Sequence, residues 1–216
     1  MSPILYYNEL SAPSRSVLMT AKAIGLDLNI KIVDMMNGEH RNPEILKMNP
    51  QHTLPILDDN GYYIWDSHAI NIYLVSTYAK NDSLYPQDPQ KRGAINQRLL
   101  FNVSVMQAEY KNIAQPLLLN TRNTISQEQR NLVHTAYGFL ESFLDGNTFI
   151  AGHSLTIADL SIVTIVSSLT SLVPINQYSR LSAWFQRMQE LPYYKELNQI
   201  GSDKMANILK SKIVNH

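Results

Sequence analysis

The sequence predicts an α+β protein, in which a two-layer α/β domain is followed by an all-helical domain. Up to residue 80, short apolar runs alternate with amphipathic stretches in the order strand, helix, strand, helix, strand, strand, helix. Residues 81–90 are polar and contain two prolines, which is typical of a linker. Residues 91–216 show helical patterns only. We therefore expect domains at 1–80 and 91–216, joined by the linker.

The first domain begins with a strand at residues 4–7 and a helix that starts at Ser11. Serine is a favoured N-cap and Pro13 suits the first turn, while Gly25 is well placed to end the helix. A second strand is expected at residues 28–33. A short helix then opens at Asn42-Pro43 and ends near residue 50.

Residues 49–70 carry the strongest local signal. Two apolar runs, of which Pro55 heads the first, flank the turn sequence Asp59-Asn60-Gly61 and predict a β-hairpin. Asp66-Ser67 follows at the expected start of a helix that ends near residue 79. A polar cap after a strand leaves backbone N–H groups directed outward, so this helix start is a candidate anion site.

The second domain is predicted to contain five helices. The first covers residues 90–115 and is closed or kinked by Pro116. Two later helices begin at capping boxes, in which a hydroxyl side chain and a residue three positions later cap each other. The expected order after Pro116 is a helix from Ser126 to Gly146, an apolar helix at 160–172 opened by Thr156 and Asp159, an amphipathic helix at 181–191, and one short helix after Ser202.

Composition excludes several classes of function. The 18 Lys and Arg residues balance 18 Asp and Glu residues, which argues against nucleic acid and acidic membranes as partners. The chain has no cysteine, hence no thiolate nucleophile or cysteine-ligated metal, and no metal site is expected. Neither a membrane-spanning run nor a signal peptide is recognisable, so the cytoplasm is the expected location.

Chemically useful side chains gather at the loop-to-helix junctions of the first domain. In an open α/β sheet such junctions meet at one edge, where ligands bind. A helix start suits a carboxylate, an aspartate suits an ammonium group, and histidines suit a second carboxylate. The ligand implied has an amino-acid group at one end and an acid at the other. The candidate residues are Ser11, His40, His52, Asp66, Ser67 and His68.

Four segments carry a family resemblance. Together they resemble, in order and over nearly the whole chain, the cytosolic glutathione S-transferases, and Ser11-Ala12-Pro13-Ser14-Arg15 is similar to the active-site serine segment of the insect delta and epsilon classes. The resemblance implies a thioredoxin-like first domain, glutathione as cosubstrate and a homodimer. The other segments are Asn49-Pro50-Gln51-His52-Thr53-Leu54-Pro55, Asp66-Ser67-His68-Ala69-Ile70 and Thr156-Ile157-Ala158-Asp159.

The resemblance implies a role for each candidate residue. Ser11 matches the serine whose hydroxyl donates to the glutathione sulfur. Leu54, before a Pro55 that is cis in this family, matches the residue whose backbone pairs with the cysteinyl amide. The remaining matches are His40 and His52 near the glycyl carboxylate, and Asp66 and Ser67 at the γ-glutamyl end, with His68 beside them. Position 66 is often glutamate in the insect classes, so the shorter Asp66 must reach further. Position 68 is commonly arginine in the delta class, whereas epsilon members can have histidine there.

Simple energetics support a serine in this role. Lowering a thiol pKa from about 8.5 by two units requires about 2.7 kcal/mol. One hydrogen bond to a charged acceptor contributes about 1.5–3 kcal/mol, and a helix N-terminus adds roughly 0.3–1 kcal/mol. Ser11 can therefore stabilise a thiolate without acting as base or nucleophile.

An electrophile pocket is expected against the helical domain. Residues at four-residue spacing, Met106, Tyr110, Ala114 and Leu118, line one helix face that suits an apolar ligand. The same stripe would also suit a helix core. The first domain would close the pocket with Leu10, Ala12 and Met36.

The predicted function is conjugation of glutathione to small hydrophobic electrophiles, as in detoxification. The same thiolate would support peroxidase, isomerase or dehydrochlorinase activity, and the residues do not separate these. The alternatives are a non-catalytic carrier of apolar ligands, which would not need Ser11, and a translation or assembly module. Ser11, Asp66 and Ser67 could also serve only as helix caps.

Overall fold

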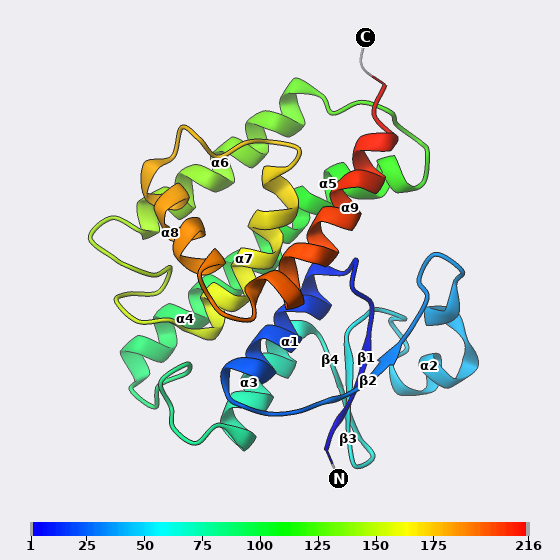
Figure 1. The fold of residues 1–216 in the computed structure, drawn as a ribbon, viewed down its shortest axis with the longest axis vertical. Coiled ribbons are helices and arrows are strands. Elements are labelled where there is room, and N and C mark those ends of the chain that lie inside the picture. The colour runs from blue at the N-terminus through cyan, green and yellow to red at the C-terminus, as the bar shows by residue number, and fades with distance from the viewer. Residues whose placement is uncertain (1, 215–216) are drawn as a thin grey trace.

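The computed structural model describes residues 2–214 (Figure 1). Its sheet has the order β2-β1-β3-β4, formed by β1 (Ile4–Tyr7), β2 (Asn29–Ile32), β3 (Ile56–Asp59) and β4 (Tyr62–Trp65). Strand β1 is parallel to β2 and antiparallel to β3, and the predicted hairpin joins β3 to β4. The α+β fold class is confirmed.

Two layers of side chains cover the sheet, because successive strand residues point to opposite faces. On one face, Leu5 and Leu57 pack against α1 (Ala12–Ala23) and α3 (Ser67–Tyr78). On the other face, Tyr6 and Ile56 pack against α2 (Pro43–Met48), which follows a short 3₁₀ turn at Glu39–Arg41. Helices α1 and α3 thereby lie between the sheet and the helical domain (Figure 1).

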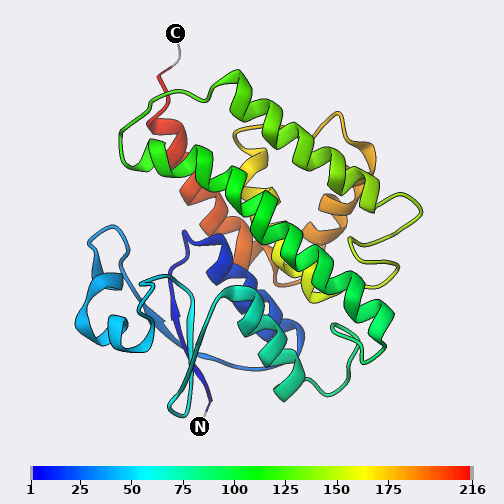
Figure 2. The same cartoon turned by 180° about the vertical axis from the view of Figure 1, so that it is seen from behind.

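The first helix of the second domain differs from the prediction. Helix α4 (Pro89–Phe101) continues through a π-helical turn at Asn102–Met106 into α5 (Gln107–Leu118), and the three form one long rod in Figure 2. Pro116 lies inside α5 and does not end it. A proline removes the donor to the carbonyl four residues earlier. Here that carbonyl, of Asn112, accepts a hydrogen bond of 2.7 Å from Nε2 of Gln129, which satisfies the freed acceptor.

Helix α7 (Ile157–Thr170) is the centre of the helical domain, with residues 157–169 all buried. It packs against α1, α4, α5, α8 (Ser179–Gln189) and α9 (Ile200–Ser211), while α6 (Gln127–Phe143) packs against α5 and α8. Both predicted capping boxes form, and α7 begins three residues earlier than expected. The C-terminal helix also starts early, since a π-helical turn at Lys195–Gln199 leads directly into α9.

The two domains share apolar packing. Ala12, Met19 and Val75, from helices of the first domain, belong to the large hydrophobic cluster of the helical domain. The loop between α3 and α4 covers most of the predicted linker. None of the helices within residues 2–214 is both long and apolar enough to cross a membrane.

Candidate functional site

The register of the sheet brings the predicted site together. Tyr6 at the end of β1 pairs with Ile56 at the start of β3, and Ile56 also pairs with Trp65 at the end of β4. The residues just beyond these strand ends therefore lie at one edge of the sheet. They are Ser11 after β1, Leu54 and Pro55 before β3, and Asp66, Ser67 and His68 after β4.

Ser11 is presented by a tight turn. The carbonyl of Asn8 accepts a 3.1 Å bond from the Ser11 N–H, and the Asn8 side chain accepts from the Leu10 N–H. The Ser11 hydroxyl oxygen accepts from the Ser14 N–H at 3.3 Å and so caps α1. As an acceptor in this bond, the half-buried hydroxyl keeps its own hydrogen available for a ligand. Capping and donation are thus compatible.

Asp66 caps α3 with one carboxylate oxygen and leaves the other to a ligand. Its Oδ1 accepts from the N–H groups of His68 at 2.9 Å and Ala69 at 3.3 Å. The Asp66 side chain is 55% exposed, so Oδ2 can accept from an ammonium group. Two of the first-turn donors are occupied by this cap, which narrows the anion site to the N–H and hydroxyl of Ser67.

His68 connects Asp66 to the helical domain. Its Nδ1 lies 3.4 Å from Oδ1 of Asp66, and its Nε2 lies 3.0 Å from Nδ2 of Asn102 in the π-helical turn. An amide that donates to Nε2 places the ring proton on Nδ1, facing the carboxylate. The His68 side chain, 3.4 Å from the Asp66 carboxyl, lowers the pKa of that carboxyl below its ordinary value, against the opposing effect of burial. Asp66 is therefore an anion at neutral pH.

His40 and His52 lie side by side, with ring centroids 6.0 Å apart. The buried Asn49 holds the loop of His52 through its side chain and carbonyl. The Nε2 of His40 accepts from Arg41, while its Nδ1 is buried and has no partner among residues 2–214. Burial, with the nearby Arg41 and His52, lowers the pKa of His40. His40 therefore offers one unpaired N–H donor.

The Leu54–Pro55 peptide bond is cis, as the resemblance implies. Both residues are buried immediately before β3, and Leu54 packs with the cluster beneath α2. The backbone of Leu54 is thus placed at the same sheet edge as Ser11 and Asp66.

The residues expected to line the electrophile pocket have different surroundings. Met106 is fully buried in the helical cluster and Ala114 nearly so. Tyr110, Leu118 and Leu10 are half-buried, Ala12 is buried and Met36 is 65% exposed. The buried Tyr110 hydroxyl has no hydrogen-bond partner within residues 2–214, and burial raises its pKa against the opposing effect of Arg15. The pocket assignment stays a prediction, with Tyr110, Leu118 and Leu10 its more accessible members.

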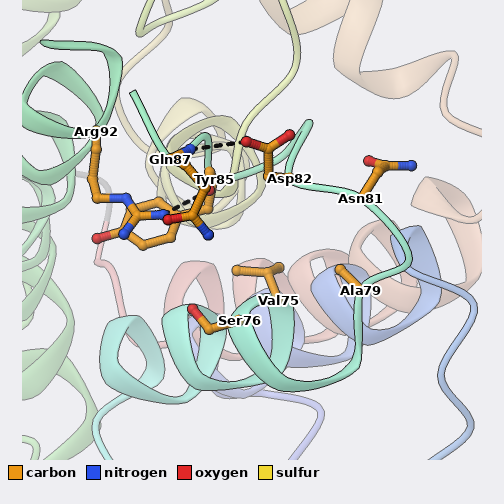
Figure 3. Close-up of a pocket in the computed structure, with 8 residues that line it drawn as sticks. All are labelled: Val75, Ser76, Ala79, Asn81, Asp82, Tyr85, Gln87 and Arg92. Atoms are coloured by element: carbon orange, nitrogen blue, oxygen red, sulfur yellow. Dashed lines mark hydrogen bonds between the residues drawn. The ribbon is translucent and has the colours of Figure 1, made fainter. Parts of the chain in front are cut away.

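A cavity of about 190 Å³ lies elsewhere, between the end of α3, the linker and the start of α4 (Figure 3). Arg92 stacks on the ring of Tyr85 there, at 4.4 Å from its centroid. The lining residues are Val75, Ser76, Ala79, Asn81, Asp82, Tyr85, Gln87 and Arg92, none of which is a predicted site residue. This cavity is therefore separate from the chemistry at the sheet edge.

Two family models match the chain in the order that the fold suggests. Residues 10–77 match the glutathione S-transferase N-terminal domain, and residues 100–192 match the glutathione S-transferase C-terminal domain. The structure has the same organisation. Its thioredoxin-like sheet presents a serine, a cis-proline and a capped helix start, and a helical domain follows. This combination places the protein in the class of glutathione-dependent enzymes.

Solved structures agree with the family models. An epsilon-class glutathione S-transferase from the housefly, Musca domestica, is 45% identical, with a TM-score of 0.96 over 99% of this chain and 100% of that one. A Drosophila mojavensis homologue with bound glutathione is 42% identical, with a TM-score of 0.95 over 98% of both chains. A delta-class glutathione transferase from Nilaparvata lugens is 38% identical, with a TM-score of 0.93 over 97% of this chain and 99% of that one. This chain belongs to the glutathione S-transferase family, and it is a glutathione-conjugating enzyme of the insect delta and epsilon type.

Sequence reasoning missed two contributors to the site. Asn102, which contacts His68, lies in a helix whose π-helical turn has no recognised signature. Arg15 is fully buried at the domain junction, where its partners come from distant parts of the chain. The available signal for a role of Asn102 was its polar side chain within the long helix.

Proposed function

We propose that the sheet edge binds glutathione along its whole length. The free Oδ2 of Asp66 accepts from the γ-glutamyl ammonium group, and the N–H and hydroxyl of Ser67 hold the adjacent carboxylate. The Leu54 backbone pairs with the cysteinyl amide. At the other end, the unpaired Nδ1 of His40, with His52 beside it, donates to the glycyl carboxylate. The observation that carries this proposal is that Ser11, Leu54, Asp66 and Ser67, whose groups complement those of glutathione, lie at one edge of the sheet.

The sulfur would then lie at Ser11. The Ser11 hydroxyl donates to the thiolate and so favours the ionised form at neutral pH. A charged hydrogen bond contributes about 1.5–3 kcal/mol, which corresponds to a pKa lowered by roughly one to two units. The thiolate attacks the electrophilic carbon, a carbon–sulfur bond forms, and the leaving group departs with its electron pair. Ser11 donates throughout and is never itself a nucleophile.

The electrophile is proposed to be small and apolar. Tyr110, Leu118 and Leu10 offer half-buried apolar surface against the hydrophobic cluster of the helical domain. Reduction of peroxides or elimination of chloride would use the same thiolate, so these activities share the site. A carrier that only sequesters apolar ligands would need the Ser11 hydroxyl as the cap of α1 but not as a donor to a thiolate.

Conjugation of a chromogenic aryl halide, with wild type and Ser11→Ala side by side, tests the function. Ser11→Ala should lower kcat by roughly 10- to 100-fold, because it removes the thiolate hydrogen bond, while the Kd for glutathione changes little. The ultraviolet absorbance of bound thiolate should fall at neutral pH. A wild type without any glutathione-dependent rate would favour the carrier, and unchanged thiolate absorbance would remove Ser11 from its role.

We also propose a homodimer in the cytoplasm. Exposed apolar side chains lie on β4 and along α4, the π-helical turn and α6. They are Tyr62, Tyr63, Leu100, Val103 and Phe139. A second copy of the chain could cover this apolar surface. The cytosol keeps thiols reduced, as the cosubstrate requires. Light scattering should give about twice the 24.6 kDa chain mass. A mass of one chain at micromolar concentration would contradict the dimer.

A further inference from the structure

The C-terminal part of the chain stabilises the turn from Asn8 to Ser11, which presents the Ser11 hydroxyl. The Glu9 peptide lies in the middle of this turn, between Asn8 and Ser11. Its carbonyl accepts a 3.0 Å bond from Nη1 of Arg15. Its carboxylate pairs with Nζ of Lys204 in α9, at 2.8 and 2.9 Å. One residue of the turn is thus fixed at both its backbone and its side chain.

Arg15, one helical turn beyond Ser11, is fixed by the helical domain. Its guanidinium is fully buried and donates from Nε to Oδ1 of Asn198 at 2.9 Å and from Nη2 to Oγ of Ser168 at 2.8 Å. Asn198 is itself fully buried in the π-helical turn before α9, and its Nδ2 donates to Ser167. The C-terminal segment therefore sets the position of Arg15, which in turn holds the Glu9 carbonyl.

Gly201 in the first turn of α9 shows how closely the two segments approach. A Cβ atom added there would lie 2.3 Å from the Glu9 carbonyl oxygen and 3.0 Å from Cδ of Arg15. Ordinary contacts begin near 3.4 Å, so the two backbones would have to separate by close to an ångström. Gly93 and Gly138, which also lie in helices, have no atom within 4 Å of such a Cβ. The glycine at 201 is required by this contact.

We propose that Gly201 and Asn198 are positioning residues for catalysis, which dock the C-terminal segment against the Ser11 turn and fix the Ser11 hydroxyl at the glutathione sulfur. The inference rests on the proposed role of Ser11. Neither residue is among the groups proposed to contact glutathione. They act through Glu9 and Arg15, and a displacement of about one ångström at a reacting centre reduces rates by about 100-fold.

The test compares Gly201→Ala with Gly138→Ala, each assayed for aryl halide conjugation across a range of pH. Gly201→Ala should lower kcat/KM by roughly 10- to 100-fold and raise the pH midpoint of its profile, because the thiolate loses its donor. The Kd for glutathione should change less than about twofold, since its other proposed contacts lie at the start of α3, in the segment before β3 and at His40. Gly138→Ala controls for the added methyl group in a helix and should retain the wild-type profile.

A purely structural role would lower the Tm of Gly201→Ala and leave its pH profile at the wild-type midpoint, which would overturn the proposal. Asn198→Ala opens space instead of forcing a clash, and it decides the question if Gly201→Ala does not fold. It should shift the midpoint upward by a smaller amount, and an unshifted midpoint in the folded variant would also overturn the proposal. An inactive wild type would instead refute the proposed function.

Discussion

The starts of α3 and α7 use the same chemistry for opposite purposes. Each start contains an aspartate that accepts from backbone N–H groups, Asp66 as the N-cap of α3 and Asp159 as the third residue of α7, after the N-cap Thr156. Asp66 at α3 is 55% exposed at its side chain and keeps Oδ2 free. Asp159 at α7 is fully buried, and both its oxygens are occupied by donors from Ile150, Thr156 and Trp184.

A capping carboxylate is therefore a candidate binding group only when one of its oxygens accepts no hydrogen bond within the protein. The pKa values of the two carboxyls reflect this contrast. The nearby His68 side chain lowers the pKa of Asp66, whereas burial raises the pKa of Asp159 despite its four donors. We assign Asp66 to ligand binding and Asp159 to the integrity of the helical domain.

The largest effect is expected from Asp159→Ala. The substitution leaves the N–H groups of Ile150, Thr156 and Trp184 buried without an acceptor. Each such group costs about 1–3 kcal/mol, so the free energy of unfolding should fall by about 3–5 kcal/mol. Urea denaturation measures it. The matched control is Ser126→Ala, which removes the exposed cap of α6 and should cost only about 1 kcal/mol. Equal losses of unfolding free energy in Asp159→Ala and Ser126→Ala would contradict the structural role assigned to Asp159.

A smaller effect, on binding, is expected from Asp66→Asn. Asparagine caps a helix as well as aspartate does, so thermal stability should hardly change. The ammonium group of glutathione would lose its charged partner, and a hydrogen bond of that kind contributes about 1.5–3 kcal/mol. Calorimetry should therefore give a Kd for glutathione that is roughly 10- to 100-fold higher. A variant that binds as tightly as wild type would make Asp66 a cap alone.

The smallest effect is the pH dependence of the two carboxylates. Asp66 has a lowered pKa in the folded protein, so its contribution to stability is present above about 3.8, the ordinary value, and is lost as pH falls through the lowered pKa. Asp159 has a raised pKa, so its contribution is present below 3.8 and decreases as pH rises through the raised value. Asp66 is well exposed, which limits its part to about 0.2–1 kcal/mol.

Urea unfolding of wild type and Asp66→Asn from pH 3 to 6 separates the two. The stability difference between them should be constant at pH 5–6 and shrink toward pH 3. A difference that grows on acidification would show that the pKa of Asp66 is raised, which would remove the distinction between the two caps.

Much of this architecture follows from local rules and was predictable. The hairpin at Asn60-Gly61, the Ser11 cap and both capping boxes involve residues within a few positions of each other. The location of the candidate site could be predicted because the strand ends at one edge of a sheet bring loop-to-helix junctions together. The candidate binding residues of the first domain could therefore be proposed from the sequence.

What the sequence did not predict depends on contacts between distant residues. Pro116 was expected to end or kink its helix, and it is accommodated because Gln129, on the next helix, supplies the missing donor. The stripe from Met106 to Leu118 suited both a core and a pocket, and Met106 lies in the core. The start of α9 was missed because Gly201 resembles a helix breaker, whereas its lack of a side chain serves close packing.

Ala12, Met19 and Val75 of the first domain pack in the hydrophobic cluster of the helical domain. The linker therefore separates two domains along the chain, but we expect these domains to unfold together as one unit. A protease cut between α3 and α4 should leave two fragments that remain associated and melt in a single transition, because each lacks part of its apolar core without the other. For the same reason, a chimera that joins this first domain to the helical domain of a relative will fold well only if that partner has matching sites for these three side chains.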